Sequence, residues 1–486
     1  MQNLSEFVKV LDVLQVIGNA DIKISGISYD SRKVQADMLF VAIKGEQFDG
    51  HDYIRFAIDQ GAKAIVCEYI PSGITQDGVA FILVEDSRAT LAQISHQWYN
   101  FPTSDMTVIG VTGTNGKTTI TFLLKKIFEK AGNKTGIIGT TGIFIGDDEF
   151  PATHTTPESL ELAAVFDNMR QEKVDVCIME VSSHALSQKR VNNIKFKCAI
   201  FTNLSHDHLD YHKTMDNYAE AKKILFNLLD PDRFAVVNGD DKFASLMVTG
   251  IKSDEICLVG RKVDSEFRII NEKIGLKDSS FELNNKLYST ILPGRFNVEN
   301  VSLSIAAALK LGIADNIIAS ALRTAQGAPG RMQRIDLYSG ASAFVDYAHT
   351  PDALENALST CKEILELNNN ENARLICVFG CGGDRDSSKR PVMGKIAAKI
   401  ADVAIVTNDN PRTEAPINII NDILSGIEDK GKCLIIQNRA YAIKKACAIA
   451  KEGDIVLIAG KGHEKYQIIG TEKLHFDDVE EVRKFS

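Results

Sequence analysis

The sequence has no excess of positive charge and no long apolar segment. Its formal net charge is −9, with 55 Lys and Arg against 64 Asp and Glu. A nucleic-acid-binding surface is not expected, because such surfaces are basic. No apolar run approaches the ~20 residues that a membrane-spanning helix requires. The first residues also lack the cationic stretch and apolar core of a signal peptide. We expect a cytoplasmic protein that binds neither nucleic acid nor membrane.

The cysteines lack the spacing of a redox or zinc motif. There are nine of them, and no C-x-x-C occurs, so neither a dithiol pair nor a zinc knuckle is indicated. Most lie in apolar runs, as Cys177 does, which is typical of buried free thiols. Free thiols in this number indicate a reducing compartment.

Three blocks of alternating strand-like and helical runs follow one another along the chain. At 486 residues the chain exceeds one ordinary core. Residues 1–103 form the first α/β block, with a linker near 101–104. Residues 104–332 have the rhythm of a doubly wound sheet, with a β-rich part at 255–292 and a boundary at the Gly-Ala-Pro-Gly run of 327–330. Residues 333–486 repeat a βα pattern. The sequence therefore predicts an α/β protein of three domains, the last of them Rossmann-like.

A glycine-rich segment at 110–119 (GVTGTNGKTT) lies between a strand-like run at 106–109 and a helical run at 120–128. This order is typical of a phosphate-binding loop. Backbone N–H groups and the helix N-terminus face the phosphates, Lys117 adds a charge, and Thr118 offers a hydroxyl to Mg²⁺. Val111 replaces the first glycine of the strict pattern, and no Asn-Lys-x-Asp guanine signature occurs. The loop predicts binding of a nucleoside triphosphate by a protein other than an ordinary GTPase or motor ATPase.

Charged side chains follow two further strands of the second block. Glu180 ends one strand, where a carboxylate can hold Mg²⁺ beside the loop; a capping or salt-bridged glutamate is the alternative. Residues 206–212 contain three histidines and two aspartates, which is dense enough for metal binding or acid–base work, although a plain polar loop remains the alternative and no thiolate supports zinc. By composition alone, Lys222 is typical of a solvated helix face.

Three polar segments follow strands of the third block. They are 383–385 (GDR), 409–412 (DNPR) and 460–464 (GKGHE). Arginines at strand ends suit bidentate recognition of carboxylates, although surface arginines are also common. Together the three segments predict a pocket for a small molecule that carries carboxylates.

In this order, these segments resemble the cytoplasmic Mur ligases of peptidoglycan synthesis. The resemblance covers essentially the whole chain, through further runs at 30–32, 40–45, 49–51, 154–158, 180–184, 207–210, 297–300, 345–351 and 380–385. Within the family, residues 409–412 resemble the signature of the members that add meso-diaminopimelate, whereas lysine-adding members usually lack the arginine. Diaminopimelate has a carboxylate that lysine lacks, and Arg385 and Arg412 can meet it.

The resemblance implies three domains, which bind the UDP-sugar, ATP and the incoming amino acid. The ATP contacts that it implies are Gly113, Thr114, Asn115, Gly116, Lys117, Thr118, Thr119, Asn297, Asn300, Arg331 and Asp346. UDP-MurNAc-L-Ala-D-Glu would contact Ser31, His51, Thr155, Thr156, Ser182, Gln188 and Arg190. Diaminopimelate would contact Arg385, Asp409, Asn410, Pro411, Arg412, Gly460 and Glu464.

The resemblance also implies two Mg²⁺ ions. Thr118 and Glu180 would hold one, and His208 and Lys222 would help to bind the second. Lys222 would be carbamylated to N6-carboxylysine, because Mg²⁺ prefers the anionic oxygen of a carbamate to a cationic amine. The catalytic set would be Lys117, Glu180, His208 and Lys222.

The implied reaction is an ATP-dependent ligation by a monomeric enzyme. Phosphoryl transfer to the D-glutamate side chain gives an acyl phosphate, and the neutral amine then displaces phosphate through a tetrahedral intermediate. Water would destroy the acyl phosphate, so domain closure is expected. The alternatives are the same ligation with L-lysine, a folylpolyglutamate synthetase, a kinase that releases its product, and a non-catalytic nucleotide-binding switch. The first domain and residues 409–412 argue against the sibling enzymes, and the catalytic set argues against the switch.

Overall fold

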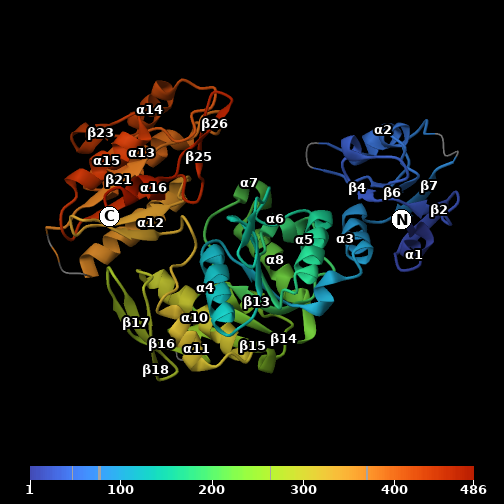
Figure 1. The fold of residues 1–486 in the computed structure, drawn as a ribbon, viewed down its shortest axis with the longest axis horizontal. Coiled ribbons are helices and arrows are strands. Elements are labelled where there is room, and N and C mark those ends of the chain that lie inside the picture. The colour runs from blue at the N-terminus through green and yellow to red at the C-terminus, as the bar shows by residue number, and fades with distance from the viewer. Residues whose placement is uncertain (46–47, 75–77, 263, 368–369, 371) are drawn as a thin grey trace.

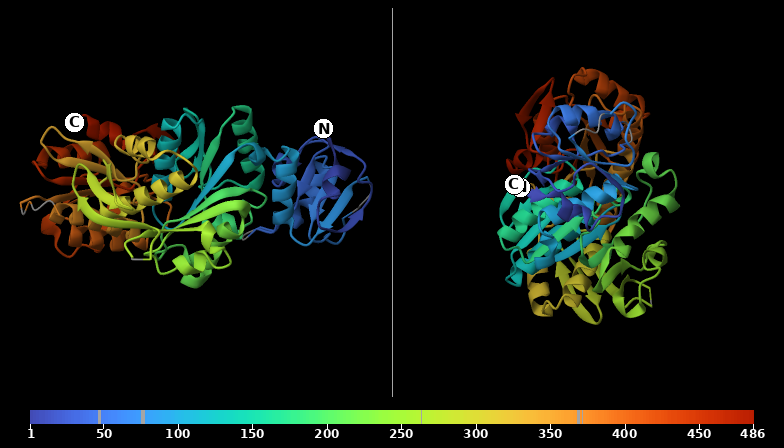
Figure 2. Two further views of the ribbon diagram at one scale, coloured as in Figure 1. Left: turned by 90° about the horizontal axis from the view of Figure 1, so that it is seen from below. Right: turned by 90° about the vertical axis from the view of Figure 1, so that its right-hand side faces the viewer.

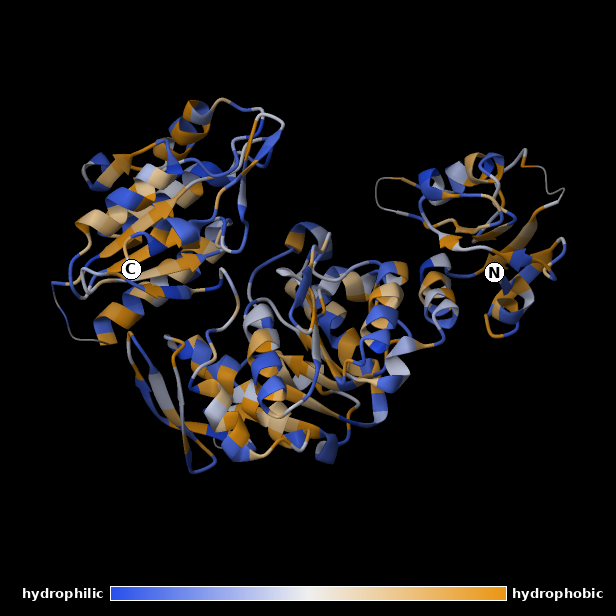
Figure 3. Ribbon diagram, in the orientation of Figure 1, coloured by the Kyte–Doolittle hydropathy of each residue, from blue (hydrophilic) through white to orange (hydrophobic). Residues whose placement is uncertain are grey.

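The computed structural model describes residues 1–45, 48–74, 78–262, 264–367, 370 and 372–486. The chain folds into three α/β bodies in sequence order, with the central body between the other two (Figures 1 and 2). Hydrophobic residues follow the strands of each sheet (Figure 3), and buried clusters fill both faces of each main sheet. The predicted α/β architecture of three domains is confirmed.

The first body is a five-stranded sheet with helices on both faces. Its order is β2 (Val13–Ile17), β7 (Ala80–Val84), β6 (Ala64–Cys67), β5 (Leu39–Val41) and β4 (Ile27–Ser28), parallel except for β2. Helices α1 (Leu4–Val8) and α3 (Ser87–Trp98) pack on one face, and α2 (Ile54–Asp59) packs on the other. Strands β1 (Gln2–Asn3) and β3 (Lys23–Ile24) form a small separate ladder. Helix α3 contacts the central body through α5 (Ser159–Gln171).

The central body is built on an eleven-stranded sheet. The order is β11 (Asp148–Phe150), β10 (Gly142–Ile145), β9 (Thr135–Gly139), β12 (Val176–Glu180), β8 (Thr107–Thr112), β13 (Phe196–Phe201), β14 (Leu229–Asn238), β15 (Ile256–Gly260), β16 (Phe267–Ile274), β17 (Ser279–Leu283) and β18 (Lys286–Thr290). Strands β9 through β16 run parallel, and both ends of the sheet are antiparallel hairpins.

Helices cover both faces of this sheet, as a doubly wound fold requires. One face carries α4 (Lys117–Lys130), α10 (Arg295–Lys310) and α11 (Asp315–Leu322). The other carries α5, α6 (Ser183–Ser187), α8 (Met215–Asn227) and α9 (Ala244–Met247), and the short α7 (Leu209–His212) lies beside α8. The chain leaves β8 at the carboxyl edge of the sheet, between β12 and β13, and enters α4 there.

The third body repeats the same design on six strands. The order is β19 (Gln333–Asp336), β20 (Ser342–Asp346), β24 (Ile455–Ala459), β21 (Leu375–Phe379), β22 (Val403–Val406) and β23 (Cys433–Ile435), with only β19 antiparallel. Helices α12 (Pro351–Leu367), α13 (Lys389–Ile400) and α14 (Pro416–Ser425) cover one face. Helices α15 (Arg439–Ile449) and α16 (Asp478–Arg483) cover the other, and β25 (Tyr466–Ile469) and β26 (Glu472–His475) form a hairpin.

The segment between α11 and β19 joins the central and third bodies. Gly327, Gly330 and Met332 all have positive φ values there. A Cβ on Gly330 would lie 2.1 Å from the backbone of Gly462, so only glycine lets this segment touch the third body so closely.

The remaining expectations about the fold concern cysteines and membranes. All nine cysteines are free, and eight of them are buried, as the apolar runs predicted. Within the described ranges, no helix is both long enough and apolar enough to cross a membrane.

Candidate active site

The phosphate-type loop lies between β8 and α4 and depends on two glycines. Gly113 has φ +145° and Gly116 has φ +88°, values that residues with a Cβ rarely adopt. A Cβ on Gly113 would lie 1.9 Å from Thr202 Oγ1, and one on Gly116 would lie 2.3 Å from Asn300 Oδ1. The loop can therefore pass between the ends of β13 and α10 only with glycine at both positions.

Lys117 begins α4 and folds back over this loop. Its Nζ donates hydrogen bonds to the carbonyl oxygens of Gly113 and Thr114, each at 2.9 Å. Burial lowers the pKa of Lys117, the nearby carboxylate of Glu180 opposes this, and the charge of Arg331 adds to it. Thr118 and Thr119 follow in the first turn of the helix, and Thr118 is buried.

Glu180 ends β12, beside the strand that carries the loop, and pairs in register with Val111. Its side chain is 1% exposed. One carboxylate oxygen accepts from Thr140 N at 2.9 Å, and the other accepts from Thr140 Oγ1 at 3.1 Å. A Cβ on Gly139 would lie 2.4 Å from this carboxylate. The carboxylate is thus fixed at the carboxyl edge of the sheet by a residue that the sequence reasoning missed.

Lys222 reaches the same loop from α8. Its side chain is 1% exposed, and its Nζ donates to Gly113 O at 2.8 Å and lies 4.4 Å from the centroid of the Tyr218 ring. Burial, and then the charge of Lys117, lower the pKa of Lys222 well below its ordinary value. The interpretation of Lys222 as a solvated lysine, drawn from composition, is wrong, because α8 turns this position toward the loop.

His208 stands at the start of α7, with φ 52°, and its ring centroid lies 4.9 Å from that of His184. The His208 side chain is 47% exposed, and its Nε2 lies 3.5 Å from Asp207 Oδ2. Partial burial and the charges of Lys117 and Lys222 lower the pKa of His208, and the charge of Asp207 opposes this. The four residues of the predicted catalytic set therefore gather around one loop. In the described part of the chain, no group of three or more His, Cys, Asp and Glu residues has the arrangement of a metal site.

The donors around the loop nevertheless fit the expected metal. The Thr118 hydroxyl and the Glu180 carboxylate are hard oxygen donors of the kind that Mg²⁺ prefers, and they need ATP oxygens and water to complete an octahedron. Such partial protein ligation is usual for Mg²⁺ at phosphate sites.

The remaining predicted ATP residues surround the loop from α10 and from the segment that enters the third body. Asn297 and Asn300 are buried and bond to each other, with Asn300 Nδ2 donating to Asn297 Oδ1 at 3.3 Å. Asp346 accepts from Met332 N at 2.7 Å and from Ala348 N at 2.9 Å. The Arg331 guanidinium lies 5.0 Å from the Tyr347 ring centroid.

Five residues predicted to contact the sugar and peptide lie beside Glu180. Thr156 Oγ1 donates to Glu180 O at 2.9 Å, and Arg190 Nη1 donates to Thr156 O at 3.0 Å. Arg190 Nη2 donates to Gln188 Oε1 at 2.6 Å, Ser182 caps α6, and the hydroxyls of Thr155 and Thr140 are 3.0 Å apart.

Two more residues of this group come from the first body. Ser31 is buried in a 3₁₀ turn. His51 is 1% exposed, with Nδ1 2.6 Å from Asp49 Oδ1 and with Nε2 accepting from Glu68 N at 2.9 Å. Both ring nitrogens of His51 are therefore engaged inside the body, and its predicted contact with uridine stays a prediction.

The predicted amino-acid residues meet at the carboxyl ends of β21, β22 and β24, which are neighbours in the sheet. Asn410 Nδ2 donates to Glu464 Oε2 at 3.1 Å. Lys461, which the sequence reasoning did not assign, is fully buried and donates to Asn410 Oδ1 at 3.1 Å and to Glu464 Oε2 at 3.2 Å. A Cβ on Gly460 would lie 2.7 Å from Asp409 Oδ2.

The two arginines of this group are less buried than Lys461. Arg385 is exposed and Arg412 is half-buried. Arg412 Nη1 donates to Gly383 O at 2.7 Å. Among the described residues, neither guanidinium forms an ion pair with a carboxylate.

A cleft of about 1010 Å³ separates the central and third bodies. Thr140 and Thr155 line it on one side, and Tyr347, His463 and Glu464 line it on the other. Burial lowers the pKa of His463 to about 4, so this imidazole is neutral near neutral pH. The cleft thus joins residues predicted for the sugar–peptide substrate to residues predicted for the amino acid.

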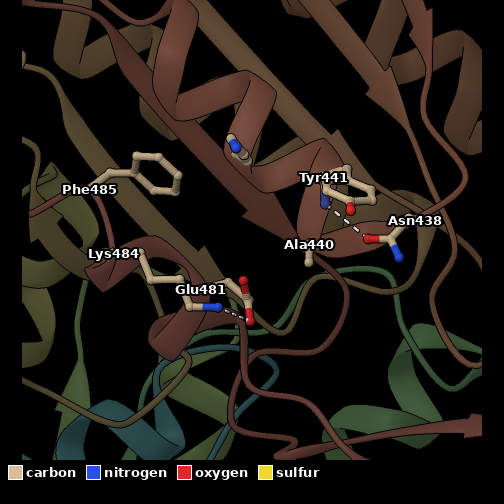
Figure 4. Close-up of a pocket in the computed structure, with 7 residues that line it drawn as sticks. Asn438, Ala440, Tyr441, Glu481, Lys484 and Phe485 are labelled. Carbon is tan, nitrogen blue, oxygen red and sulfur yellow. Dashed lines mark hydrogen bonds and ion pairs between the residues drawn. The ribbon is translucent and has the colours of Figure 1, made fainter.

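A smaller hollow of about 450 Å³ lies between α15 and α16, away from these residues. Figure 4 shows Tyr441 beside Asn438, and Lys484 paired with Glu481, around this hollow. The described residues that line it include none of the predicted site residues.

Comparisons with known proteins cover the whole chain. Three family models match it, described as Mur ligase family, catalytic domain (residues 23–99), Mur ligase middle domain (111–308) and Mur ligase, glutamate ligase domain (330–462). A UDP-N-acetylmuramoyl-L-alanyl-D-glutamate--2,6-diaminopimelate ligase of Clostridium botulinum is 42% identical over 99% of both chains. One of Bacillus velezensis is 45% identical over 95% of this chain and 94% of its own.

Solved structures agree with these matches. A structure of a UDP-N-acetylmuramoyl-L-alanyl-D-glutamate--2,6-diaminopimelate ligase is 33% identical, with a TM-score of 0.70, over 99% of this chain and 98% of its own. The MurF ligase of Thermotoga maritima in complex with ADP shares the fold at 18% identity, with a TM-score of 0.57, over 94% and 96% of the two chains. The family that the sequence motifs predicted is confirmed, and the chain belongs to the Mur ligase family.

Proposed function

We propose that this protein joins meso-diaminopimelate to the D-glutamate side-chain carboxylate of UDP-MurNAc-L-Ala-D-Glu, using ATP, to make a precursor of peptidoglycan. The names of full-length relatives support this substrate pair. The observation that carries it is the pair Arg385 and Arg412, which stand at the sheet edge without carboxylate partners among the described residues. Their charges are available for the carboxylate that distinguishes diaminopimelate from lysine.

The central body would activate the carboxylate. Lys117 would leave the carbonyl oxygens of Gly113 and Thr114 and contact the phosphates, and the first turn of α4 would face the same anions. Thr118 and Glu180 would hold one Mg²⁺, and His208 and Lys222 would help to hold a second. Bound Mg²⁺ neutralises the charge that develops as the phosphoryl group moves to the carboxylate.

The surroundings of Lys222 support its proposed carbamylation. CO₂ adds to a neutral amine and not to an ammonium, and burial beside Lys117 favours the neutral amine of Lys222. The carbamate would add a negative charge near Gly113 in place of this neutral amine, which suits a metal ligand.

The third body would deliver the amine to the acyl phosphate. The nitrogen of diaminopimelate attacks the acyl carbon, a tetrahedral intermediate forms, and the C–O bond to phosphate breaks to leave the amide. Asp409, Asn410 and Glu464 lie where they can bind the amino acid, and the cleft between the two bodies must narrow to bring amine and acyl group together.

We also propose domain limits of 1–103, 104–332 and 333–486. Each of the three main sheets lies wholly within one of these ranges. Small substrates and a site within one chain favour a monomer, and the reaction belongs to the cytoplasmic stage of cell-wall synthesis.

A competition assay tests the proposal. The protein is incubated with ATP, Mg²⁺, UDP-MurNAc-L-Ala-D-Glu and equal concentrations of meso-diaminopimelate and L-lysine, and the products are identified by mass spectrometry. We expect ADP, phosphate and the diaminopimelate amide. A preference for L-lysine would overturn the amino-acid assignment, and the absence of an amide with either amine would overturn the ligase itself.

A further inference from the structure

Two loops of the third body lie against each other and carry Arg385 and Arg412, neither of which has a carboxylate partner among the described residues. The loop after β21 contains Asp384 and Arg385, and the loop after β22 contains Arg412, Thr413 and Glu414. The Asp384 carboxylate accepts from Thr413 N at 3.0 Å and from Thr413 Oγ1 at 2.8 and 2.9 Å. In return, the Glu414 carboxylate accepts from the backbone N–H of Asp384. Each loop thus binds the backbone of the other through a carboxylate.

A buried arginine binds one of these carboxylates, that of Glu414. Arg390, in α13, is 2% exposed. Its Nη1 and Nη2 donate to the two oxygens of Glu414, each at 2.9 Å, and Nη1 also donates to Asp422 Oδ2 at 2.9 Å. Its Nη2 donates in addition to Gly382 O at 3.1 Å. Arg390 therefore fixes both loops to the same helix.

The backbones fit too closely to tolerate side chains. A Cβ on Gly383 would lie 1.9 Å from Pro411 O, and one on Gly382 would lie 2.9 Å from Arg412 Nη1. Asp384 and Arg412 themselves have φ values of 52° and 53°. Residues other than glycine keep this conformation only where surrounding contacts impose it, and the two-way hydrogen bonds supply such contacts.

The arrangement also sets the electrostatics of the two arginines. Hydrogen bonds from Thr413 lower the pKa of the Asp384 carboxyl, and the charges of Arg412 and Arg385 lower it further. Asp384 is thus an anion close to both guanidinium groups, yet it forms an ion pair with neither among the described residues. Its hydrogen bonds are directed to Thr413, so Asp384 does not compete with a ligand carboxylate for Arg385 or Arg412.

We propose that Asp384, Thr413 and Glu414, supported by Arg390, form a loop latch that sets the separation and direction of Arg385 and Arg412. This inference rests on the proposed function, because it assigns the latch to recognition of the second carboxylate of diaminopimelate. The latch residues are positioning residues: they act through the arginines and not through the reacting atoms.

Thr413 gives the sharpest test. Thr413→Val removes the hydroxyl and keeps the shape, whereas Thr413→Ser keeps the hydroxyl. Losing one such hydrogen bond corresponds to a factor of roughly 3–10. We expect Thr413→Val to raise KM for diaminopimelate by that factor, with kcat and the KM values for ATP and UDP-MurNAc-L-Ala-D-Glu unchanged, and Thr413→Ser to behave like the wild type. Asp384→Ala should raise KM further, because it removes both interactions with Thr413.

Kinetics with L-lysine distinguish a loss of diaminopimelate recognition from a general loss of folding or activity in the variant. Lysine has no second carboxylate, so kcat/KM for L-lysine, measured at high L-lysine concentrations, should be the same in Thr413→Val and in the wild type, while that for diaminopimelate falls. An unchanged KM for diaminopimelate in both Thr413→Val and Asp384→Ala would overturn the latch, as would equal losses for both amino acids. A wild-type enzyme that forms no diaminopimelate amide would instead overturn the proposed function, and the latch assignment with it.

Discussion

The proposed site has two ends, the phosphate loop of the central body and the amino-acid pocket of the third body. They differ in how they bind their positively charged side chains. At the phosphate end, Lys222 is buried and Lys117 is half-buried, and both donate to the carbonyl oxygen of Gly113. At the amino-acid end, Arg385 is exposed and Arg412 is half-buried, with Arg412 Nη1 donating to Gly383 O, and Asp384 and Thr413 bind the two loops to each other. The first end binds both of its cations to its own backbone, whereas at the second end, among the described residues, only one nitrogen of Arg412 is bound in this way.

This difference assigns catalysis to the phosphate end and amino-acid specificity to the other end. Enclosing a lysine disfavours its charged form, and the lowered pKa of Lys222 opens a covalent modification that an exposed lysine would undergo less readily. Open guanidinium groups keep their charge and discriminate between ligands by whether a carboxylate is present. Changes at the phosphate end should therefore reduce kcat, and changes at the amino-acid end should raise KM for one substrate.

The largest effect is expected from Lys222→Ala. Loss of a group that stabilises the transferred phosphoryl group typically costs about 10²–10³-fold in rate, so kcat should fall by at least that factor for any amino acid. Kinetics with saturating substrates measure this directly, and partial recovery with short carboxylates would support the carbamate.

The neighbouring lysine is the matched control for this experiment. Lys223 lies on the same helix and pairs with Glu220 at 3.9 Å, outside the loop. Lys223→Ala should keep wild-type kcat. Full activity in Lys222→Ala would show that the reaction needs no carbamate at this position. The two ends of the site would then no longer differ in their effect on kcat.

The second effect, at the opposite end, is expected from Arg412→Ala. A charge-assisted hydrogen bond contributes ~1.5–3 kcal/mol, so KM for diaminopimelate should rise roughly 10–100-fold while kcat changes little. Steady-state kinetics with each substrate varied in turn separate the two parameters. Arg412→Lys keeps the charge and loses the fork geometry, so its KM should lie between the two. An Arg412→Ala enzyme with normal KM would remove Arg412 from the amino-acid site.

The sequence predicted the parts of each end that depend on local order. A strand, two glycines and Gly-Lys-Thr define the loop around Gly113 without reference to the rest of the chain. Strand ends likewise placed Glu180, Arg385 and Arg412 at carboxyl edges, because parallel strands bring those edges together.

The parts of the site that the sequence did not predict depend on contacts between residues that are far apart in the chain. The burial of Lys222 follows from how α8 packs, and a helix with one inward lysine has no distinct local pattern. Thr140 is revealed only by its two bonds to Glu180. Arg390 and Glu414 are 24 positions apart, and either one alone reads as an ordinary surface charge.

The smallest effect concerns the pH dependence of stability and tests one buried histidine at the phosphate end. His212, at the phosphate end, is buried, and its Nε2 lies 2.9 Å from Ser183 Oγ. Burial lowers the pKa of His212 to about 4, and the charges of His184, Lys222 and His208 lower it further, against Asp210. The unfolded chain binds a proton below pH 6.5 that the folded protein rejects. Stability from this group is therefore complete above pH 6.5 and is lost as the pH falls toward 4.

This loss should amount to roughly 1–2 kcal/mol between pH 6.5 and pH 5. Denaturant unfolding at several pH values measures it, and His212→Gln should reduce the acid-induced loss by this amount, while His96 and His463, whose pKa values burial also lowers to about 4, keep their own shares. His475 in the third body is the control, because pairing with Glu480 raises its pKa and gives the opposite sign. His475→Gln should leave the acid-induced loss in place. If His212→Gln left the slope unchanged, protonation of His212 would not contribute to the acid-induced loss.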